Sequence, residues 1–376
     1  MNKKYAFVFI ISFLIGAKSF AQSDTKDPKA WTPEDIVYTE SMRAPVFSPD
    51  GNMVVWSKSK AVKKKDRFVA NLYLTRLGVQ EDGKFLTTQL TQGDENDYSA
   101  IFSKDSKALY FLSSRDKGKK LWKLSLYGGE AEEIHEFDNG ISSIQLKDKN
   151  TLFFTSKNGK TLYDLEAEEK EDNVQVIEDS LHWQPSHIYA FDLEDKKITR
   201  ITDNTKPIRG YQLSHDGNYL YYSITRSLSY GADAQKDPYS YLVNLKTGDK
   251  KQILKDFEFP IYSVQFTADD SGFYFGTGFS SDPEWNGAGI TELYYYDIAS
   301  AKATKVDLDW ELGIGGGYTV AGNDVIVSLA NKATMKLAYY TKKGTSWSRS
   351  EMDFDDKNEH VSLNAIADDA SKIVYT

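Results

Sequence analysis

One short unit recurs along this chain, and it constrains the fold more than any other feature. Each copy has an alternating apolar run, then Ser or Thr, one further residue, Asp and a small residue, followed by a second alternating run. The clearest copy runs from Val46 through Ser48-Pro49-Asp50-Gly51 into Met53–Trp56. Internal repeats have to be identified first, because they determine the architecture of the whole chain.

Six further copies follow the first. They begin at Ile101, Ile144, Tyr211, Val264, Tyr318 and Leu363. Period-two alternation gives a strand one buried face. Asp, Ser and Gly are turn residues, because the polar side chains bond nearby amides and Gly accepts a positive φ. Each copy is therefore predicted to be a β-hairpin, with degenerate turns in the third and sixth copies.

A second pair of strand-like runs follows most copies. These pairs occupy residues 120–134, 187–201, 240–253 and 292–306. Two hairpins per repeat make four antiparallel strands, which is one blade of a β-propeller. An aromatic content of 14% fits strands, where flat rings pack on a pleated surface. The sequence predicts an all-β propeller of about seven four-stranded blades over residues 44–376, with WD40-like or TolB-like repeats.

The repeats are mostly spaced more widely than the roughly 40–50 residues of a standard blade. We expect the extra residues in three loops, within Asp164–Gln184, Ser223–Pro238 and Gly276–Ile290. The third loop contains Asp282-Pro-Glu-Trp-Asn-Gly287, where a carboxylate beside Trp could hold the ammonium end of a peptide by charge and cation–π attraction. The alternative is a long blade loop with a packing Trp.

The first 21 residues predict a secretory signal peptide. Lys3 and Lys4 precede an apolar run over Tyr5–Ile15, and small residues follow at Ser19 and Ala21. The run is shorter than the roughly 20 residues that span a bilayer, and no Cys follows the cleavage site. We therefore expect an exported protein, periplasmic or secreted, without a membrane anchor.

Residues 22–43 form the predicted lead-in to the propeller. Thr32-Pro33-Glu34-Asp35 indicates a helix start, with Thr32 as cap, Pro33 in the first helical position and Asp35 reaching back. We expect a short helix that ends near Glu40.

Charge and cysteine content exclude several classes of protein. A formal net charge of −9 argues against a nucleic-acid partner, which requires a basic face. The absence of Cys excludes disulfides and Cys-based zinc sites. One basic run, Lys58 to Arg67, is predicted to be a solvated hairpin tip between Met53–Ser57 and Phe68–Thr75, with an anion-binding patch as the alternative.

The sequence contains no Gly-x-Ser-x-Gly nucleophile elbow. Gly276–Ser280 has the wrong order, and the Gly-rich stretch Gly313–Gly317 lacks the Lys-Ser/Thr of a phosphate-binding loop, so we interpret it as a loop before a strand. The acidic stretch Asp353–Glu359 lacks the Gly and Glu of a calcium loop and is interpreted as a solvated loop.

The five histidines are His135, His182, His187, His215 and His360. His182 and His187 are five residues apart around Pro185, which does not place them on one helical face, and His215 is predicted in a turn, so metal binding is the weaker interpretation. We predict no catalytic, cofactor-binding or metal-binding residue in this chain, and no cofactor.

Together these residues resemble the N-terminal part of a secreted bacterial serine peptidase of the prolyl oligopeptidase family. The resemblance rests on the order of a signal peptide, Trp31–Ile36, Phe47–Gly51 and the later tips of the same kind. The dipeptidyl-peptidase and acylaminoacyl-peptidase branches are the most similar, although the paired glutamates of the dipeptidyl peptidase IV branch are not recognisable. It implies a propeller that caps an α/β-hydrolase domain, and the catalytic Ser-Asp-His triad would lie in that domain.

The last copy of the unit ends at Thr376 inside its second strand, so we expect the chain to be a fragment with the hydrolase domain downstream. On this reading the chain is a non-catalytic, substrate-gating propeller, inactive alone, in an enzyme that hydrolyses short peptides. The alternative is a non-enzymatic periplasmic propeller, similar to TolB, that binds a protein partner. The reading frame beyond Thr376 separates the two.

Overall fold

The computed structural model describes residues 31–115, 119–171, 184–225, 239–257, 259–282, 289–352, 354 and 361–376. The chain divides into two compact units, Met1–Glu40 and Ser41–Thr376. The predicted signal peptide lies outside the described residues. Within the described part, no helix has the length and apolar character needed to cross a bilayer.

The first unit contains one short helix, α1 (Pro33–Val37). Thr32 caps it, since the Asp35 amide donates to Thr32 Oγ1 at 3.1 Å and the Thr32 amide donates to Asp35 Oδ2 at 2.9 Å. The predicted start is confirmed, and the helix ends earlier than the predicted Glu40.

The second unit is built from six four-stranded antiparallel sheets and one two-stranded sheet. Blade 1 contains β1 (Ser41–Phe47), β2 (Met53–Val62), β3 (Arg67–Glu81) and β4 (Lys84–Gln89), and blade 2 contains β5 (Asp97–Phe102), β6 (Ala108–Ser113), β7 (Lys120–Ser125) and β8 (Glu132–Glu136). Blade 3 contains β9 (Ser142–Leu146), β10 (Thr151–Lys157), β11 (Ser186–Asp192) and β12 (Ile198–Arg200), and blade 4 contains β13 (Ile208–Leu213), β14 (Tyr219–Ile224), β15 (Tyr239–Asn244) and β16 (Lys250–Ile253). Blade 5 contains β17 (Ile261–Phe266), β18 (Gly272–Phe279), β19 (Ile290–Asp297) and β20 (Lys302–Lys305), and blade 6 contains β21 (Ile314–Ala321), β22 (Asp324–Asn331), β23 (Thr334–Lys343) and β24 (Ser346–Glu351).

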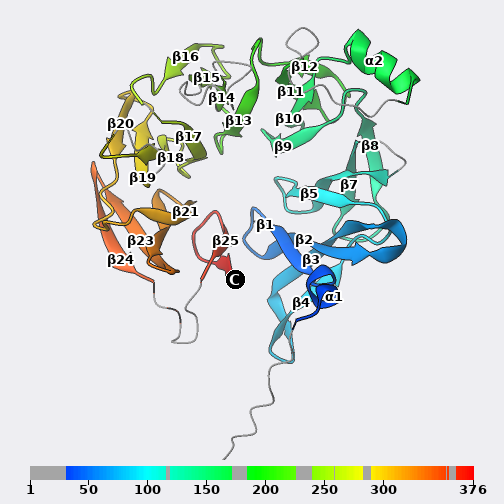
Figure 1. The fold of residues 1–376 in the computed structure, drawn as a ribbon, viewed down its shortest axis with the longest axis horizontal. Helices are drawn as coiled ribbons and strands as arrows, with labels where there is room; N and C mark the ends of the chain where they lie inside the picture. Colours follow the sequence, from blue (N-terminus) through cyan, green and yellow to red (C-terminus); the bar gives the residue numbers. More distant parts are fainter. Residues whose placement is uncertain are drawn as a thin grey trace, which may run out of the picture. The chain divides into compact units, whose positions relative to one another are not determined.

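The blades of this unit follow one another around a central opening, with the first strand of each blade nearest the centre (Figure 1). Apolar clusters lie between consecutive blades, such as the one that joins Phe111 to Leu74 and the one that joins Tyr340 to Leu293. This arrangement buries each sheet on both faces, which accounts for second strands that are buried along most or all of their length. The predicted all-β propeller is confirmed.

The last hairpin, β25 (Leu363–Ile366) and β26 (Ile373–Tyr375), lies between blade 6 and blade 1. Ala367 packs with Phe47 and Val54 of blade 1, and Lys372 Nζ donates to the Gly51 carbonyl at 2.8 Å. Side-chain packing therefore joins the two ends of the second unit. The described chain holds six complete blades, and a seventh four-stranded blade remains a prediction.

The turn between the first and second strands of a blade, which we call its tip, has the predicted chemistry. In blade 1, Ser48 Oγ donates to Asp50 Oδ1 at 2.6 Å and the Asn52 amide donates to the same oxygen at 3.1 Å. The hydroxyl–carboxylate bond recurs at 2.7 Å in Ser103–Asp105, at 2.7 Å in Ser214–Asp216 and at 2.8 Å in Thr267–Asp269.

The residue after the tip aspartate adopts a left-handed backbone conformation, as Gly217 does with φ +68°. A Cβ at Gly217 would also lie 2.8 Å from the Lys147 carbonyl oxygen of blade 3, so this position requires glycine. In the last hairpin, the Ser371 amide donates to the carboxylate of Asp369 at 3.0 Å, so Asp369 is the aspartate of this turn.

Three predicted loops or tips are partly strand. Lys58 and Lys60 belong to β2, and the turn between β2 and β3 is a single turn at Lys63–Asp66. Gly276–Phe279 extends β18, and Ile314–Gly317 begins β21. The glycines of these strands favoured a loop prediction from the sequence. In the structure they permit close packing against side chains: a Cβ on Gly276 would lie 2.8 Å from the ring of Tyr262.

The structure also adds elements that the sequence pattern did not predict. A helix, α2 (Leu162–Glu169), lies in the first predicted long loop, and Thr161 and Asp164 form its capping box. Blades 1 and 6 carry complete second hairpins, β3–β4 and β23–β24. The remaining parts of the three long loops lie mostly outside the described residues.

Candidate functional site

The junction between blades 3 and 4 is closed near the centre by a glutamine of β9. Gln145 Nε2 donates to the Tyr211 carbonyl at 3.1 Å, and the Leu213 amide donates to Gln145 Oε1 at 3.0 Å. The Tyr211 hydroxyl donates to the Ser143 carbonyl. The side-chain amide of Gln145 thus pairs with one carbonyl and one amide of β13, as the backbone of a neighbouring strand would. We call this arrangement the glutamine clamp.

The same clamp closes the junction between blades 5 and 6. Gln265 Nε2 donates to the Tyr318 carbonyl at 3.0 Å, and the Val320 amide donates to Gln265 Oε1 at 3.0 Å. The Tyr318 hydroxyl donates to the Ser263 carbonyl, and the residue is only 8% exposed. A glutamine on one blade and a tyrosine on the next therefore form one repeated device.

The junction between blades 4 and 5 lacks this device among the described contacts. Gln212 holds the glutamine position in β13, but its Nε2 donates to the Leu213 carbonyl at 3.3 Å instead. In β17, Val264 precedes Gln265 and stands where Tyr211 and Tyr318 stand in the neighbouring blades. A valine has no hydroxyl and much less volume, so space is left at this junction.

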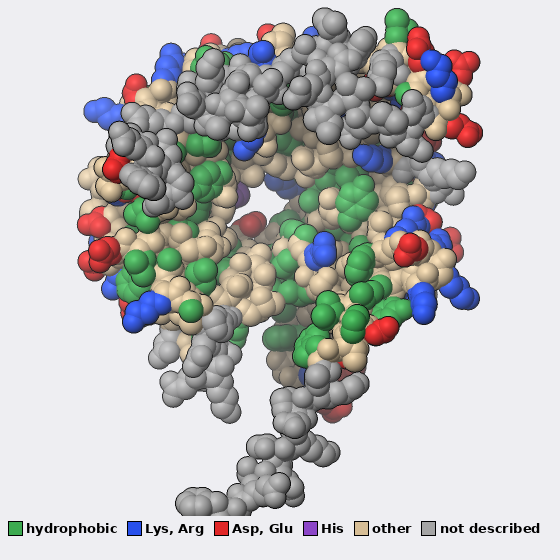
Figure 2. Space-filling view, viewed as in Figure 1, with side chains coloured by type: hydrophobic (Ala, Val, Ile, Leu, Met, Phe, Trp, Pro, Cys, Tyr) green, Lys and Arg blue, Asp and Glu red, His purple; other side chains and the backbone are tan. Residues whose placement is uncertain are grey.

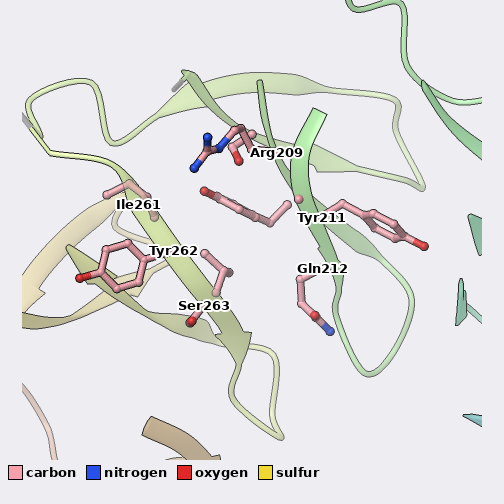
Figure 3. Close-up of a pocket in the computed structure, with 10 residues that line it drawn as sticks. Arg209, Tyr211, Gln212, Ile261, Tyr262 and Ser263 are labelled. Carbon is pink, nitrogen blue, oxygen red and sulfur yellow. The ribbon is translucent and has the colours of Figure 1, made fainter. Parts of the chain in front are cut away.

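A cavity of about 290 Å³ occupies that space between β13 and β17 (Figure 3). Tyr211 points away from it toward blade 3, whereas Arg209, Ile261 and Ser263 lie around it (Figure 3). This volume lies at the small end of the roughly 300–1,000 Å³ typical of ligand pockets. We take the cavity as the candidate functional site.

The lining combines one cation with hydroxyl groups and apolar surface. Arg209 is the charged residue of the lining, Ser223 and Ser263 contribute hydroxyls, and Ile261 and Val264 are apolar. At the inner wall, Tyr221 is 3% exposed and its Oη lies 3.0 Å from Ser240 Oγ. Burial raises the pKa of Tyr221 to about 12, so the phenol is neutral at pH 7.

Arg209 owes its position to an irregularity of the strand. The pairing of β13 with β14 shifts between Ile208 and Gly210, so Arg209 is the extra residue of a bulge. Bulges re-aim side chains. In blades 1, 2, 3 and 5 a small residue in the left-handed conformation occupies the bulge of the first strand: Ala44, Ser99, Ser143 and Ser263.

Blades 4 and 5 are joined at their tips, as blades 5 and 6 are by Asp269 and Asn323. The Asp270 carboxylate accepts the amides of His215 at 2.9 Å and Asp216 at 2.8 Å, and its Oδ1 lies 3.0 Å from His215 Nδ1. A second cavity of about 170 Å³ lies beside this contact, lined by residues from blades 4, 5 and 6 and the last hairpin, including Gln212 and Asp368. Figure 2 shows the central opening onto which the first strands face.

The residues that the sequence raised as candidates lie apart from one another. His135 packs against the rings of Phe137 and Phe191, and His187 Nδ1 lies 3.1 Å from Asn204 Oδ1. His182, His360, Asp353, Asp355, Asp356, Glu359 and residues 283–287 lie outside the described residues. Within the described ranges, no three metal-ligating side chains gather at one point.

Two residues of the basic run are paired with an acidic side chain. Lys65 Nζ lies 3.2 Å from Glu95 Oε1, and Arg67 Nη2 lies 2.6 Å from Glu95 Oε2. These ion pairs tie the blade 1 hairpin to the segment that leads into blade 2. No sequence motif includes Arg209. The repeat position of Val264 carries tyrosine in blades 4 and 6 but not in blades 1 to 3, so the sequence alone does not mark this junction.

No family model matches the sequence. Among curated proteins, it is 22% identical to dipeptidyl-peptidase 5 of Porphyromonas gingivalis over 342 residues, which is 84% of this chain and 48% of that protein. It is 25% identical to the uncharacterised peptidase YuxL of Bacillus subtilis over 178 residues, which is 46% of this chain and 25% of that protein. The chain thus spans about half the length of the first of these relatives and a quarter of the second.

Solved structures show the same fold at low identity. Pyrococcus horikoshii acylaminoacyl peptidase has a TM-score of 0.63 at 15% identity, and the match covers 92% of this chain and 50% of that one. The propeller domain of the trilobed protease of Pyrococcus furiosus has a TM-score of 0.55 at 13% identity, over 87% of this chain and 86% of that one. An oligogalacturonate lyase in complex with manganese has a TM-score of 0.61 at 14% identity, and the match covers 89% of this chain and 86% of that one.

The comparisons confirm the resemblance to the propeller part of dipeptidyl-peptidase-like and acylaminoacyl-peptidase-like enzymes. The curated relatives are peptidases, and the propeller architecture accounts for the structural matches.

Proposed function

We propose that this chain is the substrate-gating propeller of a serine peptidase that hydrolyses short peptides. The observation that carries the proposal is a ring of blades with a cavity of about 290 Å³ beside its central opening, in a chain similar to half of a dipeptidyl peptidase. A hydrolase domain would supply the nucleophile, the base and the oxyanion hole.

The gating role follows from size. The packed blades leave a narrow opening, and a folded protein cannot enter an opening that admits an extended peptide. Binding energy gained on the propeller would then position the peptide for attack, which contributes to catalysis by orienting the reactants. We also propose that the protein is exported, on the basis of the predicted signal peptide.

The test uses the protein made from its complete reading frame. We expect it to hydrolyse chromogenic peptides of a few residues, to leave a folded protein substrate intact and to lose activity with a serine-directed inhibitor. The 376-residue chain is the matched control and should show no turnover. Turnover by this chain alone, or equal cleavage of folded proteins and short peptides, contradicts the proposal. A reading frame without a Gly-x-Ser-x-Gly domain favours a propeller that binds a protein partner.

A further inference from the structure

We propose that the cavity between blades 4 and 5 binds the free C-terminal carboxylate of a short peptide, with Arg209 as its cation and the apolar lining as the seat of the last side chain. This inference rests on the proposed function, because it assigns the kind of peptide end that the propeller holds.

The charge of the lining selects an anionic group. Arg209 is charged, and no carboxylate belongs to the lining residues within the described ranges. A protein with a net charge of −9 repels anions over most of its surface, so an anionic ligand requires a local cation. A guanidinium has five N–H donors in a fork that matches a carboxylate, so Arg209 can serve a ligand in addition to a protein partner.

The rest of the lining selects the remainder of the ligand. Ile261, Val264 and the Tyr221 ring provide an apolar wall, and Ser223 and Ser263 provide hydroxyls that can bond the last peptide unit. A volume of about 290 Å³ suits the end of a peptide and not a longer segment. A C-terminal residue with an apolar side chain presents a carboxylate and an apolar group on one carbon atom, as this lining requires.

The cavity distinguishes this junction from the two junctions beside it. The two neighbouring junctions fill the corresponding place with Tyr211 and Tyr318. Only at the described junction of blades 4 and 5 do a bulged arginine and a valine coincide. If the C-terminus of a peptide is held there, the distance from that end to the bond that is cleaved is fixed. The site would therefore select substrates by length.

The probes are the tripeptide Ala-Ala-Leu and its C-terminal amide, titrated calorimetrically into the 376-residue chain. We expect the free acid to bind at least about tenfold more tightly than the amide, which corresponds to the loss of one charge-assisted contact. Arg209→Ala should remove this preference, and Arg209→Lys should retain part of it. Tyr318→Phe, which alters the neighbouring junction, should leave both affinities unchanged.

A second variant tests the place of binding. Val264→Tyr introduces the residue of blades 4 and 6 and should fill the cavity, so that neither probe binds while the midpoint of unfolding stays unchanged or rises. Equal affinity for acid and amide, no binding by the original chain, or a preference that survives Arg209→Ala would overturn the inference. Serine-inhibitor-sensitive hydrolysis by the complete protein would still support the proposed function in that case.

Discussion

The junction between blades 5 and 6 and the junction between blades 4 and 5 are built from the same repeat but differ at the position that Tyr318 holds in blade 6 and Val264 holds in blade 5. Gln265 and Tyr318 close the first through three hydrogen bonds. Val264 stands in place of the tyrosine at the second, and a cavity results. A ligand site can thus arise at a blade junction that lacks a contact made by the two neighbouring junctions.

The largest expected effect concerns the glutamine clamp. Gln265→Ala removes both bonds to β21 and leaves two backbone groups without their partner, which should lower the free energy of unfolding by about 2–3 kcal/mol. Gln212→Ala, at the corresponding position of blade 4, loses only a bond of 3.3 Å to Leu213 and should cost about 0.5 kcal/mol. Chemical denaturation measures both, and equal losses would show that the two junctions are not different.

Asp270 should have the next largest effect, because it joins the tips of blades 4 and 5. Its side chain is 8% exposed and accepts two amides, so Asp270→Ala should cost about 1.5–3 kcal/mol. Asp368→Ala, an exposed aspartate that lines the neighbouring cavity, is the control and should have little effect. A small loss for Asp270→Ala would mean that blades 4 and 5 are held together by their apolar cluster alone.

Removal of the buried Tyr318 hydroxyl should have a smaller effect on the free energy of unfolding. Tyr318→Phe deletes the bond to the Ser263 carbonyl at a buried position and should cost about 1 kcal/mol. Tyr262→Phe deletes a bond of 2.8 Å to Thr291 from a residue that is 40% exposed, and water can replace it. Thermal unfolding should distinguish the two variants, and a Tyr262→Phe loss as large as that of Tyr318→Phe would contradict the argument from burial.

The smallest effect is expected at the tips and depends on pH. The Ser48 hydroxyl lowers the pKa of Asp50, and the Ser103 hydroxyl lowers the pKa of Asp105. A carboxyl group with a lowered pKa stabilises the fold above the unfolded value of 3.8, and this contribution is lost as pH falls through the folded pKa. The Asp50→Asn, Asp105→Asn double variant should therefore lose less stability than the original chain below about pH 4. Urea denaturation at several pH values measures this, and parallel curves would refute it.

Much of the architecture could be predicted from the repeat. The Ser-x-Asp tips and the capped helix at Thr32 are local patterns, and the cited hydrogen bonds form between residues two or three positions apart. The two hairpins per blade follow from the alternating runs on either side of such turns. The helix α2 begins with the same Thr-x-x-Asp pattern as α1, at Thr161–Asp164, so this local signal was present in the sequence. The strand character of Gly315–Gly317 could not be predicted from such a pattern. Glycine is disfavoured in isolated strands, and it is accepted here because Ala330, Ser328 and Met335 pack directly against the backbone.

The site was less predictable than the fold. Arg209 and Val264 are ordinary residues in the sequence, and neither belongs to a motif. Arg209 and Ile261 line one cavity only because blades 4 and 5 lie side by side and a bulge re-aims the arginine.

The sequence by itself determined the strand pattern and the chemistry of the tips, because alternation and turn propensity act over a few residues. Only the tertiary structure decided which junction is clamped and which is open. That depends on the side chains that two separate blades present to each other, and on the volume that remains when a tyrosine is replaced by Val264.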